Sequence, residues 1–197
     1  YDIALADEGM HAENQLYKTV TKDENGTGGI YSTRNTTEEF KDKKGQVVLR
    51  RAYNGGTAHD TYYVHDQYGN LALVVPPLAN GATGTAILDG LCYQYRYDHR
   101  NRLVEKKLPG RQWEFIVYDR LDRVVATGPA FSPFSNITAS GWLMTKYDVF
   151  NRPVLTAWKQ ATPTSASRKA LQDLYNAASL VSESRTTAEN TMNGVSF

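Results

Sequence analysis

Five aspartates in similar surroundings are the first candidates for chemistry in this chain of 197 residues. They are Asp42, Asp66, Asp98, Asp119 and Asp148. Two carboxylates that converge on a substrate can act as general acid and base or as nucleophile, as they do in glycoside hydrolysis. A catalytic interpretation requires one aspartate to stand apart from its copies, and none does. We therefore expect structural carboxylates and no catalytic residue, with a glycosidase-type hydrolase as a further alternative.

The residue three positions after each aspartate explains the repetition better. These residues are Gly45, Gly69, Asn101, Asp122 and Asn151. All three residue types tolerate a positive φ at low steric cost. An aspartate at the first position of a type I turn can also accept a hydrogen bond from the backbone two residues on. The phrase Asp-x-x-(Gly/Asn/Asp) therefore predicts a hairpin turn, and these ten residues are its structural positions.

The segments around these turns have the composition of β-strands. Before one turn, 93-YQYRYD-98 alternates aromatic and polar residues, and after it 102-RLVEKK-107 contains long and branched side chains. Asn54-Gly55 and Pro109-Gly110 add further turn signals. The sequence predicts a mainly all-β fold, an antiparallel meander of about ten strands of ordinary length built as consecutive hairpins.

The chain has three expected parts. Residues 1–39 form a polar, turn-rich lead-in that has room for one strand. Residues 40–158 form the hairpin sheet. Residues 159–197 contain a linker, one C-terminal α-helix at about 167–183 and the start of a next repeat. The helix has Ser165 or Ser167 as its N-cap, and we expect it to pack against the sheet. Its apolar positions are Ala170, Leu171, Leu174, Ala178 and Val181.

Composition excludes several other classes of site and partner. The formal net charge of +1 gives no general attraction to nucleic acid. The four histidines are scattered, which does not favour a metal site, and we expect no cofactor. Cys92 is the only cysteine and lies in an apolar stretch, where a thiol is buried and inert. The chain lacks an initiator Met, and we expect it to be a piece of a longer protein.

Three tyrosines form the remaining candidate site. Tyr93, Tyr95 and Tyr97 alternate along one predicted strand and therefore share a face of the sheet. A buried face makes them part of the core or a stacking ladder. An exposed face would suit the rings of a sugar, so a carbohydrate-binding module that uses exposed Tyr and Trp is the second function class.

The repeated phrase resembles the tyrosine–aspartate (YD) repeat of bacterial Rhs proteins and wall-associated proteins, roughly Tyr-Asp-x-x-Gly-Arg-Leu. Residues 97–103 match it closely, residues 118–124 and 147–153 match it well, and residues 66–71 also fit. In the first copy Lys41 replaces the aromatic residue. The C-terminal helix resembles the insert between repeats in long Bacteroidetes-type members.

This resemblance implies β-hairpins stacked into a spiral sheet, which closes into a shell in full-length members. It also implies a cell-surface or secreted protein that encloses or presents a C-terminal effector. The self-cleaving Asp-Pro-x-Gly motif of the family is absent from this sequence. We expect a non-catalytic scaffold segment whose partners are the remaining repeats of the parent protein and its effector. An exposed strand edge would be covered by the helix or would pair edge to edge in a homodimer.

Overall fold

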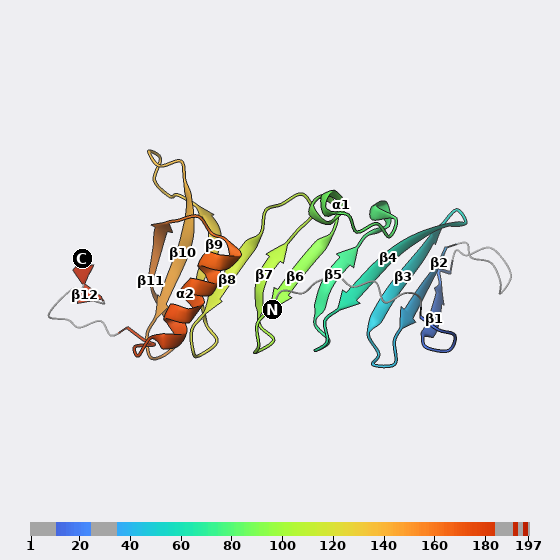
Figure 1. The fold of residues 1–197 in the computed structure, drawn as a ribbon, viewed down its shortest axis with the longest axis horizontal. Helices are drawn as coiled ribbons and strands as arrows, with labels where there is room; N and C mark the ends of the chain where they lie inside the picture. Colours follow the sequence, from blue (N-terminus) through green and yellow to red (C-terminus); the bar gives the residue numbers. More distant parts are fainter. Residues whose placement is uncertain (1–10, 25–34, 184–190, 193–194, 197) are drawn as a thin grey trace. The chain divides into compact units, whose positions relative to one another are not determined.

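The computed structural model describes residues 11–24, 35–183, 191–192 and 195–196 (Figure 1). Parts of the predicted lead-in and of the predicted next repeat lie outside these residues. The chain divides into two compact units, Tyr1–Gln112 and Trp113–Phe197. The predicted hairpin segment 40–158 therefore contributes to both units.

Unit 1 contains seven strands that pair in chain order. They are β1 (Tyr17–Lys22), β2 (Thr36–Lys41), β3 (Val47–Asn54), β4 (Thr57–His65), β5 (Leu71–Val75), β6 (Tyr93–Tyr97) and β7 (Leu103–Lys107). Each strand is antiparallel to its neighbour within the unit. A short 3-10 helix, Pro77–Ala79, and the short helix α1, Thr85–Gly90, lie between β5 and β6. These helices lie beside a small core of Leu73, Val75, Ala79 and Cys92.

Unit 2 contains four strands of the same meander and the C-terminal helix. They are β8 (Glu114–Tyr118), β9 (Val124–Phe131), β10 (Ser140–Tyr147), β11 (Pro153–Gln160) and α2 (Ser165–Ala177). The short strands β12 (Thr191–Met192) and β13 (Val195–Ser196) form a separate pair. The predicted fold class is confirmed, since the protein is mainly an antiparallel meander with one C-terminal helix. Within the described residues the meander has eleven strands, which pair in chain order from β1 to β11.

One hairpin turn differs from its prediction by one residue. Asn54 pairs with Thr57, so Gly55 and Gly56 are the two loop residues, and the predicted Asn54-Gly55 turn is wrong. The φ angles of Gly55 and Gly56 are 58° and 90°, the pattern of a type I′ turn. This register places Arg51 opposite Asp60, where the Arg51 Nε–H donates to Asp60 Oδ1 at 2.7 Å. The observed register thus places the two charges of this ion pair directly opposite each other.

Helix α2 begins and ends earlier than its apolar spacing indicates. Its N-cap is Thr164, whose hydroxyl accepts from the Ser167 N–H at 3.1 Å, so the predicted Ser165 or Ser167 cap is wrong. The Ser167 hydroxyl in turn accepts from the Thr164 N–H at 2.8 Å, which completes a capping box. The helix ends at Ala177, so Val181 lies beyond it.

Helix α2 covers a face of the four-stranded sheet of unit 2 (Figure 1). Leu171 and Tyr175 of the helix pack against a buried cluster. The cluster consists of Phe115, Val117, Val125, Ala126 and Trp142. The predicted packing of the helix on the sheet is confirmed, whereas edge pairing between two copies stays a prediction. Within the described residues, no helix combines the length and the apolar character needed to cross a membrane.

Candidate functional site: the aspartate turns and the Arg123 cluster

The five aspartates occupy equivalent positions in five hairpin turns. At Asp98, the backbone N–H donates to the Arg102 carbonyl at 3.0 Å, and the Asn101 N–H donates to the Asp98 carbonyl at 3.0 Å. The carboxylate Oδ1 accepts from the N–H groups of Arg100 at 2.9 Å and Arg102 at 3.1 Å. The same four bonds recur at Asp42, Asp66, Asp119 and Asp148. Each carboxylate therefore substitutes for a backbone acceptor inside its own turn.

The residue three positions after each aspartate has the left-handed conformation that its type indicates. The φ angles are 83° at Gly45, 90° at Gly69, 58° at Asn101, 61° at Asp122 and 62° at Asn151. A β-bulge follows in the pairing register of every one of these hairpins. A type I turn with a left-handed residue and a bulge is a standard way to close a short hairpin.

The second carboxylate oxygen is also engaged in four of the five turns. Oδ2 accepts from the Nε–H of the arginine four residues later in the turns of Asp98, Asp119 and Asp148, at 2.7–2.8 Å. At Asp66 the Asn70 side chain donates instead, at 3.0 Å. In these four turns both carboxylate oxygens accept hydrogen bonds from the turn itself, which leaves little capacity for proton transfer to a substrate. The geometry therefore favours a structural role over acid–base chemistry.

Acid is expected to destabilise the hairpins through these carboxylates. Burial opposes the charge of Asp98, but its bonds to Arg102 and to backbone N–H groups outweigh burial and lower its pKa. The pKa values of Asp66 and Asp148 are lowered by a similar balance. An aspartate whose pKa is lower in the folded protein than in the unfolded chain stabilises the fold at any pH above its unfolded pKa of about 3.9. This stabilisation is lost as the pH falls through the pKa of the folded protein. The melting temperature should therefore fall mainly below about pH 4.

Circular dichroism melts between about pH 7 and pH 2 would measure this effect. Asp98→Asn keeps an oxygen acceptor but removes the charge, so its melting temperature should depend less on pH than that of the wild type. A wild-type melting temperature that stays constant below about pH 4 would contradict the structural role of the carboxylates.

Tyrosines that precede the turns connect neighbouring repeats. The Tyr97 hydroxyl donates to the Leu71 carbonyl at 3.1 Å, and the Tyr147 hydroxyl donates to the Val124 carbonyl at 2.8 Å. Each acceptor lies five residues after the aspartate of the preceding repeat, so the two bonds are equivalent. The side chains of Asn70 and Asn101 make a further contact between adjacent turns at 3.2 Å. The sequence alone left Tyr97 as part of the core, of a stacking ladder or of a sugar-binding face, gave Tyr147 no role, and did not predict the hydroxyl bonds.

Removing one of these hydroxyls should weaken the protein measurably. Tyr97→Phe and Tyr147→Phe each leave a carbonyl without its donor, which is expected to cost about 0.5–1.5 kcal/mol in the free energy of unfolding. Tyr93→Phe is the matched control, because Tyr93 is 38 % exposed. Urea denaturation followed by circular dichroism would compare the three variants, and equal stabilities would exclude a role for the hydroxyls.

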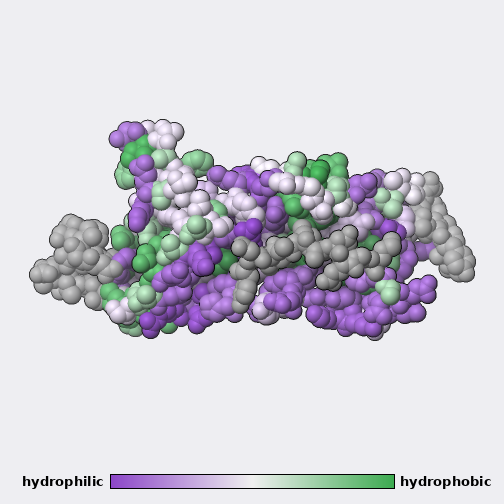
Figure 2. All heavy atoms as spheres, viewed as in Figure 1, coloured by the Kyte–Doolittle hydropathy of each residue, from purple (hydrophilic) through white to green (hydrophobic). Residues whose placement is uncertain are grey.

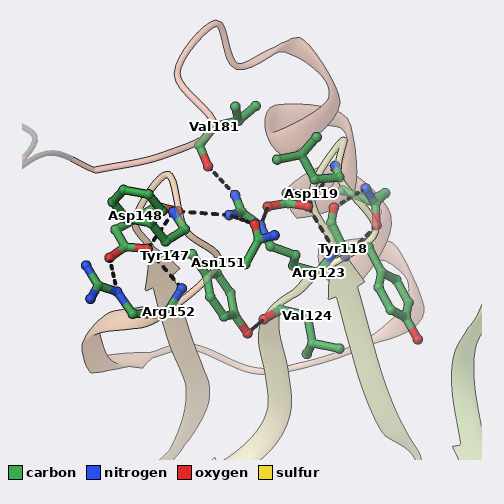
Figure 3. Close-up of polar contacts among 12 residues, drawn as sticks. Tyr118, Asp119, Arg123, Val124, Tyr147, Asp148, Asn151, Arg152 and Val181 are labelled. Atoms are coloured by element: carbon green, nitrogen blue, oxygen red, sulfur yellow. Dashed lines mark hydrogen bonds and ion pairs between the residues drawn. The ribbon is translucent and has the colours of Figure 1, made fainter.

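Arg123 is the centre of the most connected of these turns (Figure 3). Its Nε–H donates to Asp119 Oδ2 at 2.7 Å, and the two side chains are only 10 % and 5 % exposed. Its Nη1 group donates to Asn151 Oδ1 at 2.9 Å and to the Asp148 carbonyl at 3.3 Å. One guanidinium therefore binds its own turn and the turn of the next repeat.

The same guanidinium also holds the chain that follows α2, here named the tail segment, residues 178–183. The Arg123 Nη2 group donates to the Val181 carbonyl, and the guanidinium carbon lies 4.8 Å from the centre of the Tyr147 ring (Figure 3). The Glu183 N–H donates to the Tyr147 carbonyl at 2.8 Å, and Lys146 pairs with the Glu183 carboxylate. These contacts position the tail segment across two turns.

A second side chain fixes α2 to strand β8. The Gln172 carboxamide accepts from the Tyr118 N–H at 3.0 Å and donates to the Tyr118 carbonyl at 2.7 Å. It thus occupies both backbone groups of one strand residue, as a neighbouring strand would. Gln172 is buried, so this pairing also satisfies its own polar atoms.

A cavity of about 370 Å³ lies between α2, the tail segment and the sheet. Its apolar wall includes Leu171, Leu174 and Val125, and Asp119 contributes to its polar side. Asp119 is already engaged by Arg123, and Glu183 by Lys146. The pair of converging free carboxylates that a hydrolase requires is therefore not formed by these two residues.

The remaining predicted candidates have different environments. Tyr93 is 38 % exposed, whereas Tyr95 and Tyr97 are half-buried and Tyr97 uses its hydroxyl within the protein. Cys92 is fully buried, and burial raises the pKa of its thiol. Among the residues that the structure describes, no three His, Cys, Asp or Glu side chains are grouped as a metal site would require.

Comparison with known proteins does not assign the chain. No protein-family model and no curated protein matches it. Its function is therefore argued from the turns and from their connections.

Proposed function

We propose that the chain is a non-catalytic scaffold segment of a cell-surface or secreted YD-repeat protein of the Rhs type. The observation that carries this proposal is the recurrence of one turn, with the same four hydrogen bonds, at five aspartates. None of the five turns stands apart from the others as a catalytic site would. The engaged carboxylates support the same conclusion, because they have little capacity left for chemistry.

The connections between repeats explain how such a scaffold would stay ordered. Hairpins alone are only marginally stable, so each must be joined to its neighbours. Tyr97 and Tyr147 provide equivalent bonds to the preceding repeat, and Arg123 joins two turns and the tail segment. In a repeat protein, stability is a sum of such neighbour contacts, and further repeats would extend the sheet. A sufficiently long sheet of this kind could enclose or present an effector at its C-terminal end.

The test is carried out on the parent protein encoded by the surrounding reading frame. The proposal expects further Asp-x-x-(Gly/Asn/Asp) hairpins on at least one side of the chain. It also expects a hollow particle in electron microscopy, and a C-terminal segment that resists protease until the shell is denatured. A parent without additional repeats, or an open particle with a freely cleaved C-terminal segment, would contradict the scaffold.

Two assays on the purified chain test the alternatives. Binding to a glycan array that is lost in Tyr93→Ala would favour a carbohydrate-binding module. Hydrolysis of a glycan that is lost in Asp119→Asn would favour an enzyme. The scaffold proposal expects neither result, and it expects Asp119→Asn to change only stability.

A further inference from the structure

The loop between β9 and β10 presents aromatic side chains to solvent. Phe131, at the end of β9, is 84 % exposed, and Phe134, within the loop, is 55 % exposed. The loop extends beyond the ends of the neighbouring strands of unit 2 (Figure 1), and green atoms lie among pale and purple ones on its surface in Figure 2. Two phenylalanines this exposed and only three residues apart are uncommon on a surface that faces water alone, and they make the loop a candidate interaction surface.

The loop is held in shape by its own hydrogen bonds. The Ser132 N–H donates to the Ala139 carbonyl at 3.1 Å, and the Ile137 N–H donates to the Phe134 carbonyl at 3.1 Å. The Phe134 N–H donates to the Ser132 hydroxyl at 3.1 Å. A preformed loop loses little conformational freedom on binding, so its exposed rings are available at low entropic cost.

Trp158 of β11 contacts β9 and the loop at two points. Its indole N–H donates to the Ala130 carbonyl at 3.0 Å. Its ring meets the Phe134 ring edge to face, with the two ring centres 6.3 Å apart. Phe134 is thereby braced on its inner side, while Phe131 has no comparable cover.

The loop contains no charged side chain, which favours an uncharged environment for it. No Asp, Glu, Lys, Arg or His occurs between Arg123 and Lys146, and the polar side chains of the loop are Ser, Thr and Asn. Neutral side chains enter the interfacial region of a bilayer at low cost, whereas charged ones carry a large desolvation penalty. Aromatic residues favour this region because their rings are amphipathic or apolar. A convex tip also needs no preshaped groove when its partner is a deformable lipid surface.

We propose that the β9–β10 loop inserts Phe131 and Phe134 into the interfacial region of a phospholipid bilayer. Two rings give a weak and reversible contact, suited to a protein that lies against a membrane without crossing it. The inference does not depend on the scaffold proposal, because it rests on the loop alone.

Flotation of the purified chain with phospholipid vesicles tests the proposal. The chain should float with pure phosphatidylcholine vesicles, and added phosphatidylglycerol or high salt should change binding little because the loop is uncharged. Phe131→Ser should weaken binding about tenfold, the effect of withholding one large apolar side chain. Phe131→Leu should retain most of the binding, and Ser135→Glu should weaken it by adding a charge.

Phe150→Ser is the matched control. Phe150 is 73 % exposed, but it lies in the Asp148 turn with the Arg152 guanidinium 5.1 Å from its ring centre. Its replacement should leave vesicle binding unchanged. The proposal is overturned if the wild-type chain does not float, if Phe150→Ser loses as much binding as Phe131→Ser, or if salt abolishes binding. Self-association that requires Phe131, without vesicle binding, would assign the loop to a protein contact and overturn it as well.

Discussion

Arg123→Ala is expected to lower the free energy of unfolding of unit 2 by about 3–5 kcal/mol, the cost of removing one partner from a buried ion pair. The substitution leaves the buried Asp119 carboxylate without its main counter-charge. It also removes the donors to Asn151 and to the Val181 carbonyl. The tail segment should then detach, because Arg123 is one of the few groups that bind it.

All three tryptophans belong to unit 2, so tryptophan fluorescence during urea denaturation would follow this unit directly. Limited proteolysis would show whether the tail segment becomes accessible to cleavage before the rest of the unit. The two measurements separate loss of stability from loss of tail docking.

Arg152→Ala is the matched control for this prediction. Arg152 makes the same contact with Asp148 that Arg123 makes with Asp119, at the same 2.7 Å. Its side chain is 71 % exposed, so solvent screens the pair and the loss should be much smaller. If both variants unfold at the same urea concentration, burial and the links to the tail segment do not strengthen the Arg123 contact.

The turns could be predicted from the sequence because all their interactions are local. Each carboxylate accepts hydrogen bonds from residues at most four positions later in the sequence. The phrase Asp-x-x-(Gly/Asn/Asp) is therefore enough to predict the turn. Gly, Asn and Asp at the fourth position of the phrase indicate a positive φ, because these residue types tolerate it best. Five copies made the pattern stronger than any single turn signal.

The connections between repeats could not be predicted in the same way. Arg123 meets Val181 across 58 residues of sequence, and Gln172 meets Tyr118 across 54. Arg123 and Arg152 both stand four residues after the aspartate of their turn, and this local position does not show that one is buried and the other exposed. Arg123 is enclosed because its guanidinium binds the Asp148 turn and the tail segment as well as its own turn, whereas the Arg152 side chain remains exposed.

The end of α2 shows a local preference that a tertiary contact outweighs. The sequence continues with Ala178 and with apolar residues at helical spacing, so the prediction extended the helix through residue 183. In the structure the Ala178 carbonyl accepts from Arg120 at 3.0 Å, and the Val181 carbonyl accepts from Arg123. Arginine side chains of the turns thus donate hydrogen bonds to carbonyls beyond the last helical residue. The backbone is extended at Ala178, where the helix has ended.

Gly141→Ala is expected to destabilise unit 2 by about 3 kcal/mol, near the upper end of the usual cost of overpacking. Gly141 lies in β10, opposite Gln160 of β11, and the Trp158 ring crosses it. A Cβ atom at this position would approach the Trp158 indole to 2.8 Å and would also collide with the Lys159 carbonyl. Backbone cannot move aside as a flexible side chain can, so the β10–β11 pairing must shift.

Tryptophan fluorescence during urea denaturation would measure the loss, and a double-mutant cycle would identify its cause. Trp158→Ala removes one of the two obstacles, so the double variant Gly141→Ala/Trp158→Ala should be more stable than the sum of the single losses predicts. Strict additivity would show that the Trp158 ring is not what excludes a side chain at residue 141. A Gly141→Ala protein as stable as the wild type would show that β10 and β11 do not approach as closely as this pairing requires. Glycine at residue 141 leaves room for the Trp158 ring, and this ring packs against Phe134 of the projecting loop.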